Sequence, residues 1–229
     1  MTGYTFPNET VIWSLLIANY PFITGIVAGS FIVSSMYYVF GWKRLKPVAK
    51  LSLLLSLTFL IISFLPLLAH LGQPSRATEI LTRPQFSSAM AMFGYIYVGY
   101  LILTFIETLF VFREGFVAKV RSTEGIVADL YRILALGSSS ISDRTAKRDL
   151  QIVRVLAFVG IPVAIMFHGY VGFIFGAVKA NPIWSTPLMP VVFILSAIVS
   201  GIALLSVVYI VSSFLSGQRP SQRRRVCPR

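Results

Sequence analysis

The sequence predicts an all-α membrane protein, formed by an antiparallel transmembrane four-helix bundle and a fifth transmembrane helix. Hydrophobic residues make up 56% of the 229-residue chain and charged residues only 12%, whereas charged residues account for about 25% of a soluble domain. The mean hydropathy is +0.79. Five apolar stretches each exceed the roughly 20 residues needed to cross hydrocarbon. They are 11–40, 51–71, 86–112, 152–178 and 188–215.

The basic residues predict the orientation of these helices. Of the 20 Lys and Arg residues, 17 lie in 43–50, 113–154 and the tail from Arg219, against three (Arg76, Arg83 and Lys179) on the opposite side. The positive-inside rule then places the N-terminus outside and the C-terminus inside. We expect a multi-pass protein of the prokaryotic inner membrane, whose charge of +12 faces anionic lipid rather than nucleic acid.

The sequence is expected to divide into three parts. Residues 1–178 form the four-helix bundle, which includes an inner loop at 113–151. Residues 179–216 hold the fifth helix, which has no evident partner elsewhere in the sequence and is interpreted as the start of a second bundle. Residues 217–229 form a basic tail that is expected to be disordered.

The first helix is expected to be a membrane anchor that lies inside the bundle. Residues 1–9 contain no basic residue and the apolar stretch is too long for a cleaved signal peptide. Gly25, Ala28, Gly29 and Ser30 have the spacing that lets helix backbones approach closely in lipid. Four prolines within apolar stretches are expected to free carbonyls and bend their helices. They are Pro21, Pro66, Pro162 and Pro190.

The second apolar stretch ends at a polar segment whose ionisable groups are costly to place near lipid. His70, Gly72, Gln73, Pro74 and Arg76 follow it directly, and the next helix starts only after Arg83-Pro84. Ionisable groups where a helix leaves lipid indicate a functional site. The segment 70–76 is therefore expected to form a short ordered hairpin at the outer face.

The inner loop between the third and fourth helices contains one amphipathic segment. Within 123–136, the apolar residues Ile126, Leu130, Ile133 and Leu134 recur at helical spacing. This pattern predicts an interfacial helix. The polar stretch from Gly137 to Asp149 is expected to be a flexible connection to the next helix.

Few polar residues lie within the spans. Asn19, His70, Glu107 and His168 are the costly ones, and the tyrosines are softer candidates: Tyr20, Tyr95, Tyr97, Tyr100 and Tyr170. Most of them fall near the outer ends of their helices, so an antiparallel bundle would bring them to one outer pocket. Glu107 alone lies toward the inner side. Because a carboxylate in hydrocarbon needs a partner or water, Glu107 is a candidate step in a proton path.

Each candidate has a structural alternative. Asn19 can bond a carbonyl freed by Pro21, and His168 can bond a neighbouring helix, as polar groups do in many membrane proteins. Arg76 can extend to the lipid headgroups. The single cysteine, Cys227, excludes an iron–sulfur cluster held by this chain alone. Any redox centre must therefore come from a partner.

Three stretches resemble one known family. They are Asn19-Tyr20-Pro21-Phe22 with Gly25 and 28–30, the segment 70–76 followed by Arg83-Pro84, and the run from His168 to Phe173 that continues to 182–184 and 196–201. In these stretches the protein resembles the NrfD/PsrC family, the quinone-reactive membrane subunits of polysulfide reductase and related respiratory complexes. The likeness extends to about Ser216.

The resemblance implies a pocket for menaquinone or ubiquinone near the outer face. It implies an adjacent extracytoplasmic iron–sulfur electron-transfer subunit, in some complexes with a molybdopterin catalytic subunit. By position, the quinone-binding residues are Asn19, His70 and Tyr170, with Tyr97 and His168 beside them. His70 and Glu107 are the expected proton-transfer residues, and Arg76 and Gln73 are expected to order the hairpin or dock the partner.

This sequence departs from the family pattern at three points. His70 stands where an aspartate is usual, and Gln73 where an arginine is usual. A histidine carries charge when protonated, whereas a carboxylate carries it when deprotonated. Family members commonly have eight or more helices, so we expect a truncated or split form that keeps the first bundle.

Two other functions are compatible with the residues. His70 and His168 are the only two histidines and could be axial ligands of one b-type haem. Alternatively, the bent helices and Glu107 could serve a small transporter or a passive assembly anchor. The polar groups favour the quinone interpretation, because they gather at one face rather than at the membrane midplane.

Overall fold

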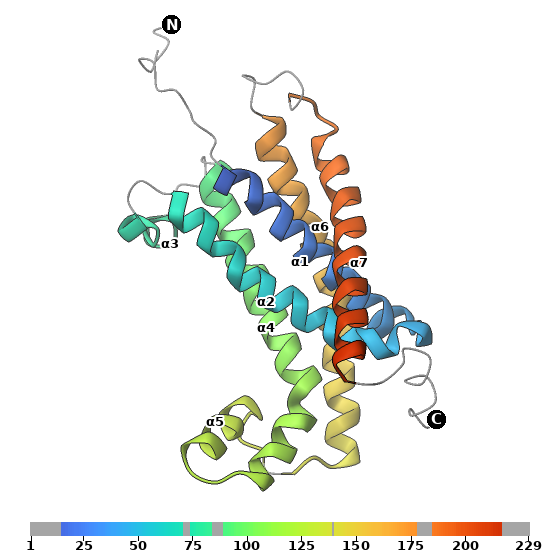
Figure 1. Ribbon diagram of the computed structural model, residues 1–229. Coiled ribbons are helices and arrows are strands. Elements are labelled where there is room, and N and C mark those ends of the chain that lie inside the picture. Colours follow the sequence, from blue (N-terminus) through green and yellow to red (C-terminus); the bar gives the residue numbers. More distant parts are fainter. Residues whose placement is uncertain (1–14, 71–73, 84–88, 139, 178–184, 217–229) are drawn as a thin grey trace, which may run out of the picture.

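The protein folds into a set of long, closely packed helices (Figure 1). The computed structural model describes residues 15–70, 74–83, 89–138, 140–177 and 185–216. Five helices in these ranges are long and apolar enough to cross a membrane: α1 (Leu15–Phe40), α2 (Lys46–His70), α4 (Ala89–Ser122), α6 (Asp143–Gly176) and α7 (Met189–Leu215). The predicted all-α class and the five transmembrane helices are confirmed.

Four short elements connect the long helices. They are the 3₁₀ turns η1 (Lys43–Leu45) and η2 (Pro74–Arg76), and the helices α3 (Glu79–Thr82) and α5 (Ile126–Leu134). Helix α5 confirms the helix expected within 123–136. His70 is the last residue of α2, and it is followed by η2 and α3, which project to one side of the long helices (Figure 1). Gln73 and the tail 217–229 lie outside the described residues.

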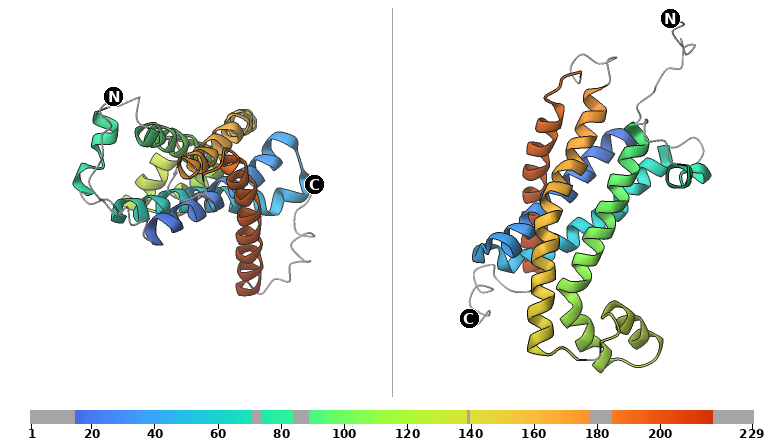
Figure 2. Two further views of the ribbon diagram at one scale, coloured as in Figure 1. Left: turned by 90° about the horizontal axis from the view of Figure 1, so that it is seen from above. Right: turned by 180° about the vertical axis from the view of Figure 1, so that it is seen from behind.

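Helix α1 is the centre of the assembly. It contacts α2, α6 and α7, while α4 packs against α6 and α2, and Figure 2 shows α1 and α2 crossing the α4–α6 pair obliquely. Serine hydroxyl groups of α2 form hydrogen bonds to the backbone of α1. Ser52 Oγ donates to the Ser30 carbonyl at 2.6 Å and Ser56 Oγ to the Val27 carbonyl at 3.0 Å. Every residue of α1 from Thr24 to Ser35 is buried, which confirms the interior position predicted from its small residues.

Helix α7 packs directly on α1 and α6, which are the partners that were not evident from the sequence. A Cβ atom on Gly29 would collide with the Ala197 carbonyl, and one on Gly201 would lie 2.6 Å from the Gly29 Cα atom. Small residues on both helices therefore permit backbone contact. The sequence did not predict which face of α7 makes this contact, because α7 is apolar on all sides.

Helices α4 and α6 are longer than their apolar stretches. Each has 34 residues, or about 50 Å at 1.5 Å per residue, against about 30 Å of hydrocarbon. The expected loop at 113–151 is therefore wrong in extent, since only 123–142 separates the two helices. The expected flexible stretch is helical from Asp143, because Ser142 Oγ accepts a hydrogen bond from the Thr145 N–H at 3.3 Å and caps the helix.

One proline does not act as predicted. Pro190 is the second residue of α7, where its missing N–H would have no helical partner in any case. The expected bend at Pro190 is therefore wrong. Pro21, Pro66 and Pro162 do lie inside α1, α2 and α6.

Candidate functional site

An aromatic cluster occupies one end of the assembly. This end, where α1, α4 and α7 begin and α2 and α6 finish, is called the predicted outer end. Phe93 of α4 lies at the centre, with its ring centroid 5.7 Å from that of Phe167 and 6.2 Å from that of Tyr170, both stacked. The aromatic cluster consists of Tyr20, Phe93, Tyr97, Tyr100, Phe167 and Tyr170.

Helical periodicity explains how α4 contributes to this cluster. Phe93, Tyr97 and Tyr100 recur at intervals of four and three residues, so they share one face. All three are buried, and Tyr100 is fully inaccessible. The same face continues inward through Thr104 and Glu107, both with no exposed surface. One stripe of α4 thus runs from aromatic rings at the predicted outer end to a carboxyl group deeper in the protein.

The tyrosine hydroxyls of the cluster differ in their partners. Tyr97 donates to the Leu60 carbonyl of α2 at 2.5 Å, so its hydroxyl is held in place. The hydroxyls of Tyr20 and Tyr100 are buried and have no hydrogen-bond partner among the described residues. An unpaired buried hydroxyl costs free energy until a ligand or water satisfies it. Within the described part of the protein, the Tyr20 hydroxyl is therefore a donor that has no acceptor.

His168 lies beside the cluster, in the contact between α1, α6 and α7. Its Nδ1 atom is 3.3 Å from Thr24 Oγ1, and its ring centroid is 5.5 Å from that of Phe193. A Cβ atom on Gly25 would lie 3.3 Å from both Cε1 and Nε2. One ring nitrogen of His168 thus lies within reach of the Thr24 hydroxyl, and the other lies where a side chain at position 25 would crowd it.

The other predicted site residues do not all meet. Asn19 is exposed on α1, so the structure does not bring its side chain into the cluster. His70 is half-buried at the end of α2 and Tyr170 is half-buried on α6. Phe64, six residues before His70, has its ring centroid 6.2 Å from that of Tyr97. The cluster therefore brings together Tyr97 and Tyr170, with His70 further along α2 on the same end.

Glu107 is the deepest charged candidate. Its side chain has no exposed surface, and neither carboxyl oxygen has a hydrogen-bond partner among the described residues. The Thr104 hydroxyl, one turn away, is also buried and has no hydrogen-bond partner in the described ranges. No cluster of three or more His, Cys, Asp and Glu residues suited to a metal occurs in the described part of the protein.

Sequence reasoning missed three residues of this region. Phe93 and Phe167 form the centre of the aromatic cluster, and Thr24 is the partner of His168. The spacing of Phe93, Tyr97 and Tyr100 on one helical face was the sequence signal that could have identified Phe93. Nothing in the sequence pairs Phe167 with Phe93, because their contact depends on how α6 lies against α4.

Nearly the whole sequence matches one protein family. Residues 3–224 match the family described as Polysulphide reductase, NrfD. The chain belongs to the NrfD family. It is 34% identical over 212 residues to the C subunit of selenate reductase from Mesobacillus selenatarsenatis, an alignment that covers 90% of this chain and 49% of the relative.

Two further relatives support this membership of the NrfD family. The protein is 30% identical to the putative membrane C subunit of dimethyl sulfoxide reductase from Halobacterium salinarum, covering 87% of this chain and 43% of that protein. It is 26% identical to the C chain of polysulfide reductase from Wolinella succinogenes, covering 89% and 60%. This NrfD chain spans about half the length of the relatives it matches first. With its five spanning helices, it is a multi-pass membrane protein.

Proposed function

We propose that this NrfD protein is the membrane anchor and quinone-reactive subunit of a respiratory oxidoreductase complex. The observation that carries the proposal is the aromatic cluster, in which Phe93 stacks on Phe167 and Tyr170 at the predicted outer end. Stacked rings bind a flat quinone ring well, because their faces offer a large contact area at little entropic cost. The matched reductase membrane subunits support the assignment to such a complex.

The side chains around the cluster divide the chemistry between them. Interconversion of quinone and quinol moves two electrons and two protons, so both ring oxygens need hydrogen-bonding groups. Tyr170 bonds one oxygen, and the unpaired hydroxyl of Tyr20 is available beside it. Asn19 is exposed on the first turns of α1, outside the aromatic cluster, where its amide meets a quinone that arrives from the lipid. The Tyr20 hydroxyl then bonds the second oxygen.

His70 and Glu107 are assigned to protons. His70 is half-buried at the end of α2 and relays protons between the ring oxygens and outer water. Glu107 lies on the same α4 face as Tyr97 and Tyr100. Its carboxyl oxygens, which have no partner among the described residues, offer a second route for protons toward the inner side. Water must connect this carboxyl group to the aromatic cluster. His168, held by Thr24, positions α6 next to the cluster.

Electrons must pass to or from another subunit. The only cysteine, Cys227, cannot hold a cluster alone. We assign the partner to an iron–sulfur subunit at the predicted outer end, docked on the projecting segment of η2 and α3 that contains Arg76. The quinone, menaquinone or ubiquinone, is the substrate.

The test is quinol-linked turnover of the purified complex. Tyr170→Phe and His70→Ala should each lower turnover at least about tenfold, the effect of losing roughly 1.4 kcal/mol of transition-state stabilisation. Tyr131→Phe removes a hydroxyl from α5, far in sequence from the cluster, and is the matched control that should keep full turnover. Full activity in both Tyr170→Phe and His70→Ala would refute the assignment.

The inner route has its own control on the same helix. Glu107→Gln removes the ionisable carboxyl at nearly constant size, whereas Glu114→Gln changes an exposed glutamate of α4 seven residues further on. Turnover should fall several-fold in Glu107→Gln and stay unchanged in Glu114→Gln. Equal turnover in the two variants would leave Glu107 as a packing residue.

A further inference from the structure

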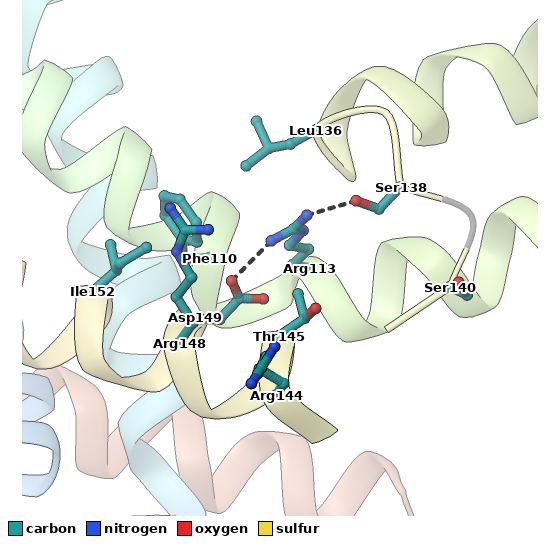
Figure 3. Close-up of a pocket in the computed structure, with 10 residues that line it drawn as sticks. All are labelled: Phe110, Arg113, Leu136, Ser138, Ser140, Arg144, Thr145, Arg148, Asp149 and Ile152. Atoms are coloured by element: carbon teal, nitrogen blue, oxygen red, sulfur yellow. Dashed lines mark hydrogen bonds and ion pairs between the residues drawn. The ribbon is translucent and has the colours of Figure 1, made fainter. Parts of the chain in front are cut away.

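A cavity lies at the end of the α4–α6 pair opposite to the aromatic cluster. It has a volume of about 460 Å³ and is bounded by α4, by the segment that follows α5, and by the start of α6 (Figure 3). Its lining residues are Phe110, Arg113, Leu136, Ser138, Ser140, Arg144, Thr145, Arg148, Asp149 and Ile152. None of them belongs to the aromatic cluster.

The three arginines that line this cavity differ in their hydrogen-bond partners. Arg113 donates to Asp149 Oδ1 at 2.8 Å and to Ser138 Oγ at 2.6 Å (Figure 3). Its Nε also donates to the Ala135 carbonyl at 3.2 Å. Arg144 and Arg148 are exposed and form no hydrogen bond or ion pair with the described residues. With Asp149 neutralised by Arg113, these two guanidinium groups leave the cavity with an uncompensated positive charge.

The same cavity has apolar walls. Phe110, Leu136 and Ile152 line it together with the charged groups. Just beyond it, Val155 and Phe158 of α6 are 62% and 65% exposed, as expected for a surface that faces lipid tails. The cavity therefore lies where the charged end of α6 changes into its apolar span.

Helix α5 directly precedes the lining segment that begins at Leu136 and carries its own apolar surface. Ile126, Leu130 and Ile133 are 88%, 55% and 72% exposed. A helix with such a face is stabilised by lying in the headgroup region of a bilayer. Because Leu136 follows α5 directly, a helix bound to the membrane surface would place the cavity opening at the level of the lipid headgroups.

We propose that this cavity binds the headgroup of an anionic phospholipid. Arg144 and Arg148 bind the phosphate, since guanidinium groups match phosphate oxygens in geometry and charge, and Phe110, Leu136 and Ile152 contact the glycerol and upper acyl chains. Basic pockets at the ends of transmembrane helices suit such headgroups. A free phosphate ion would use the arginines but gain nothing from the apolar walls.

The test is lipid-dependent stability of the whole protein in a zwitterionic detergent. Thermal unfolding is followed while phosphatidylglycerol, phosphatidylcholine or inorganic phosphate is added at matched concentrations. Phosphatidylglycerol should raise the unfolding temperature, and phosphatidylcholine and inorganic phosphate should have little effect. In Arg144→Gln/Arg148→Gln, the phosphatidylglycerol concentration that gives the half-maximal shift should rise about tenfold.

The matched control removes two charges from another basic segment. Lys43→Gln/Arg44→Gln changes two exposed residues of η1 and should shift the half-maximal concentration less than about twofold. The unfolding temperatures without lipid should agree among the three proteins, since all four changed residues are exposed. Equal losses in the two double variants would overturn the proposal, because they would indicate attraction by overall charge. Equal stabilisation by phosphatidylcholine or by inorganic phosphate would also overturn it.

Discussion

The two ends of the α4–α6 pair are joined by different kinds of contact. At the predicted outer end, Phe93 of α4 stacks on Phe167 and Tyr170 of α6. At the other end, Arg113 of α4 pairs with Asp149 of α6 at 2.8 Å, and the two side chains are only 12% and 10% exposed. The same two helices are thus held by rings at one end and by charges at the other.

This difference indicates how each end responds to change. Aromatic rings pair in offset-stacked or edge-to-face arrangements, and another flat ring can take part in either. A buried ion pair is directional, and the loss of one partner leaves an uncompensated charge. The aromatic end is therefore suited to a substrate that enters and leaves, while the charged end fixes the relative position of the helices.

Removal of the Arg113 side chain should have the largest effect on stability. Arg113→Ala strands the buried Asp149 carboxylate and should lower the free energy of unfolding by about 3–5 kcal/mol, as measured by chemical unfolding in micelles. Arg132→Ala breaks an ion pair with Asp129 in which the two side chains are 58% and 69% exposed. It should lower the free energy of unfolding by less than about 0.5 kcal/mol. Similar losses in the two variants would contradict the buried role of Arg113.

Truncation of the central ring at the aromatic end comes next. Phe167 has no exposed surface and contacts Phe93, Tyr97 and Tyr100. Phe167→Ala should lower the free energy of unfolding by about 3 kcal/mol, because a cavity replaces the ring. Phe158→Ala, on the exposed face of α6, serves as the control and should change it by less than about 1 kcal/mol. A tolerated Phe167→Ala would mean that the rings of α4 and α6 repack without it.

A substitution that keeps the positive charge at position 113 separates the ion pair from the hydrogen bonds of the Arg113 side chain. Arg113→Lys retains the ion pair with Asp149 but loses the bonds to Ser138 and the Ala135 carbonyl, because an ammonium group lacks the guanidinium fork. The free energy of unfolding should fall by about 1–2 kcal/mol. If Lys were as damaging as Ala at this position, the hydrogen-bond geometry rather than the charge would hold this end together.

The smallest effect is expected from a single hydroxyl of the aromatic cluster. Tyr97→Phe removes the hydrogen bond to the Leu60 carbonyl and should cost about 1 kcal/mol, because the ring contacts persist. Tyr131→Phe, whose ring packs on Phe116 of α4, provides a reference near zero. A loss above about 3 kcal/mol in Tyr97→Phe would show that this end also depends on directional contacts.

Much of the fold was predictable because hydrophobic stretches of this length have one stable form in a bilayer. Residues 51–71 and 188–215 predict α2 and α7 closely at their ends near His70 and Leu215. The extensions of α4 to Ser122 and of α6 from Asp143 were not predicted, because helices continue into the polar region where hydropathy gives no signal. The cap at Ser142 was visible in the sequence only as one of several serines.

The candidate site was predicted less completely. The tyrosines Tyr97 and Tyr170 were singled out and do lie together around Phe93. Asn19 was assigned to the same pocket, but it is exposed on α1 while its neighbour Tyr20 is buried. The depth of a residue in the membrane follows from its position in the sequence. Its direction around the helix does not follow in α1, where apolar and small residues occupy all sides.

The sequence by itself determined the membrane class, the five spanning helices and the NrfD family of this protein. These depend on the length, composition and local order of residues, which act through the cost of unpaired backbone groups in lipid. Only the tertiary structure decided which faces meet: α7 on Gly29, Phe93 on Phe167, and Arg113 on Asp149. These contacts join residues far apart in the sequence, and in helices that are apolar all round only close packing selects one face over another.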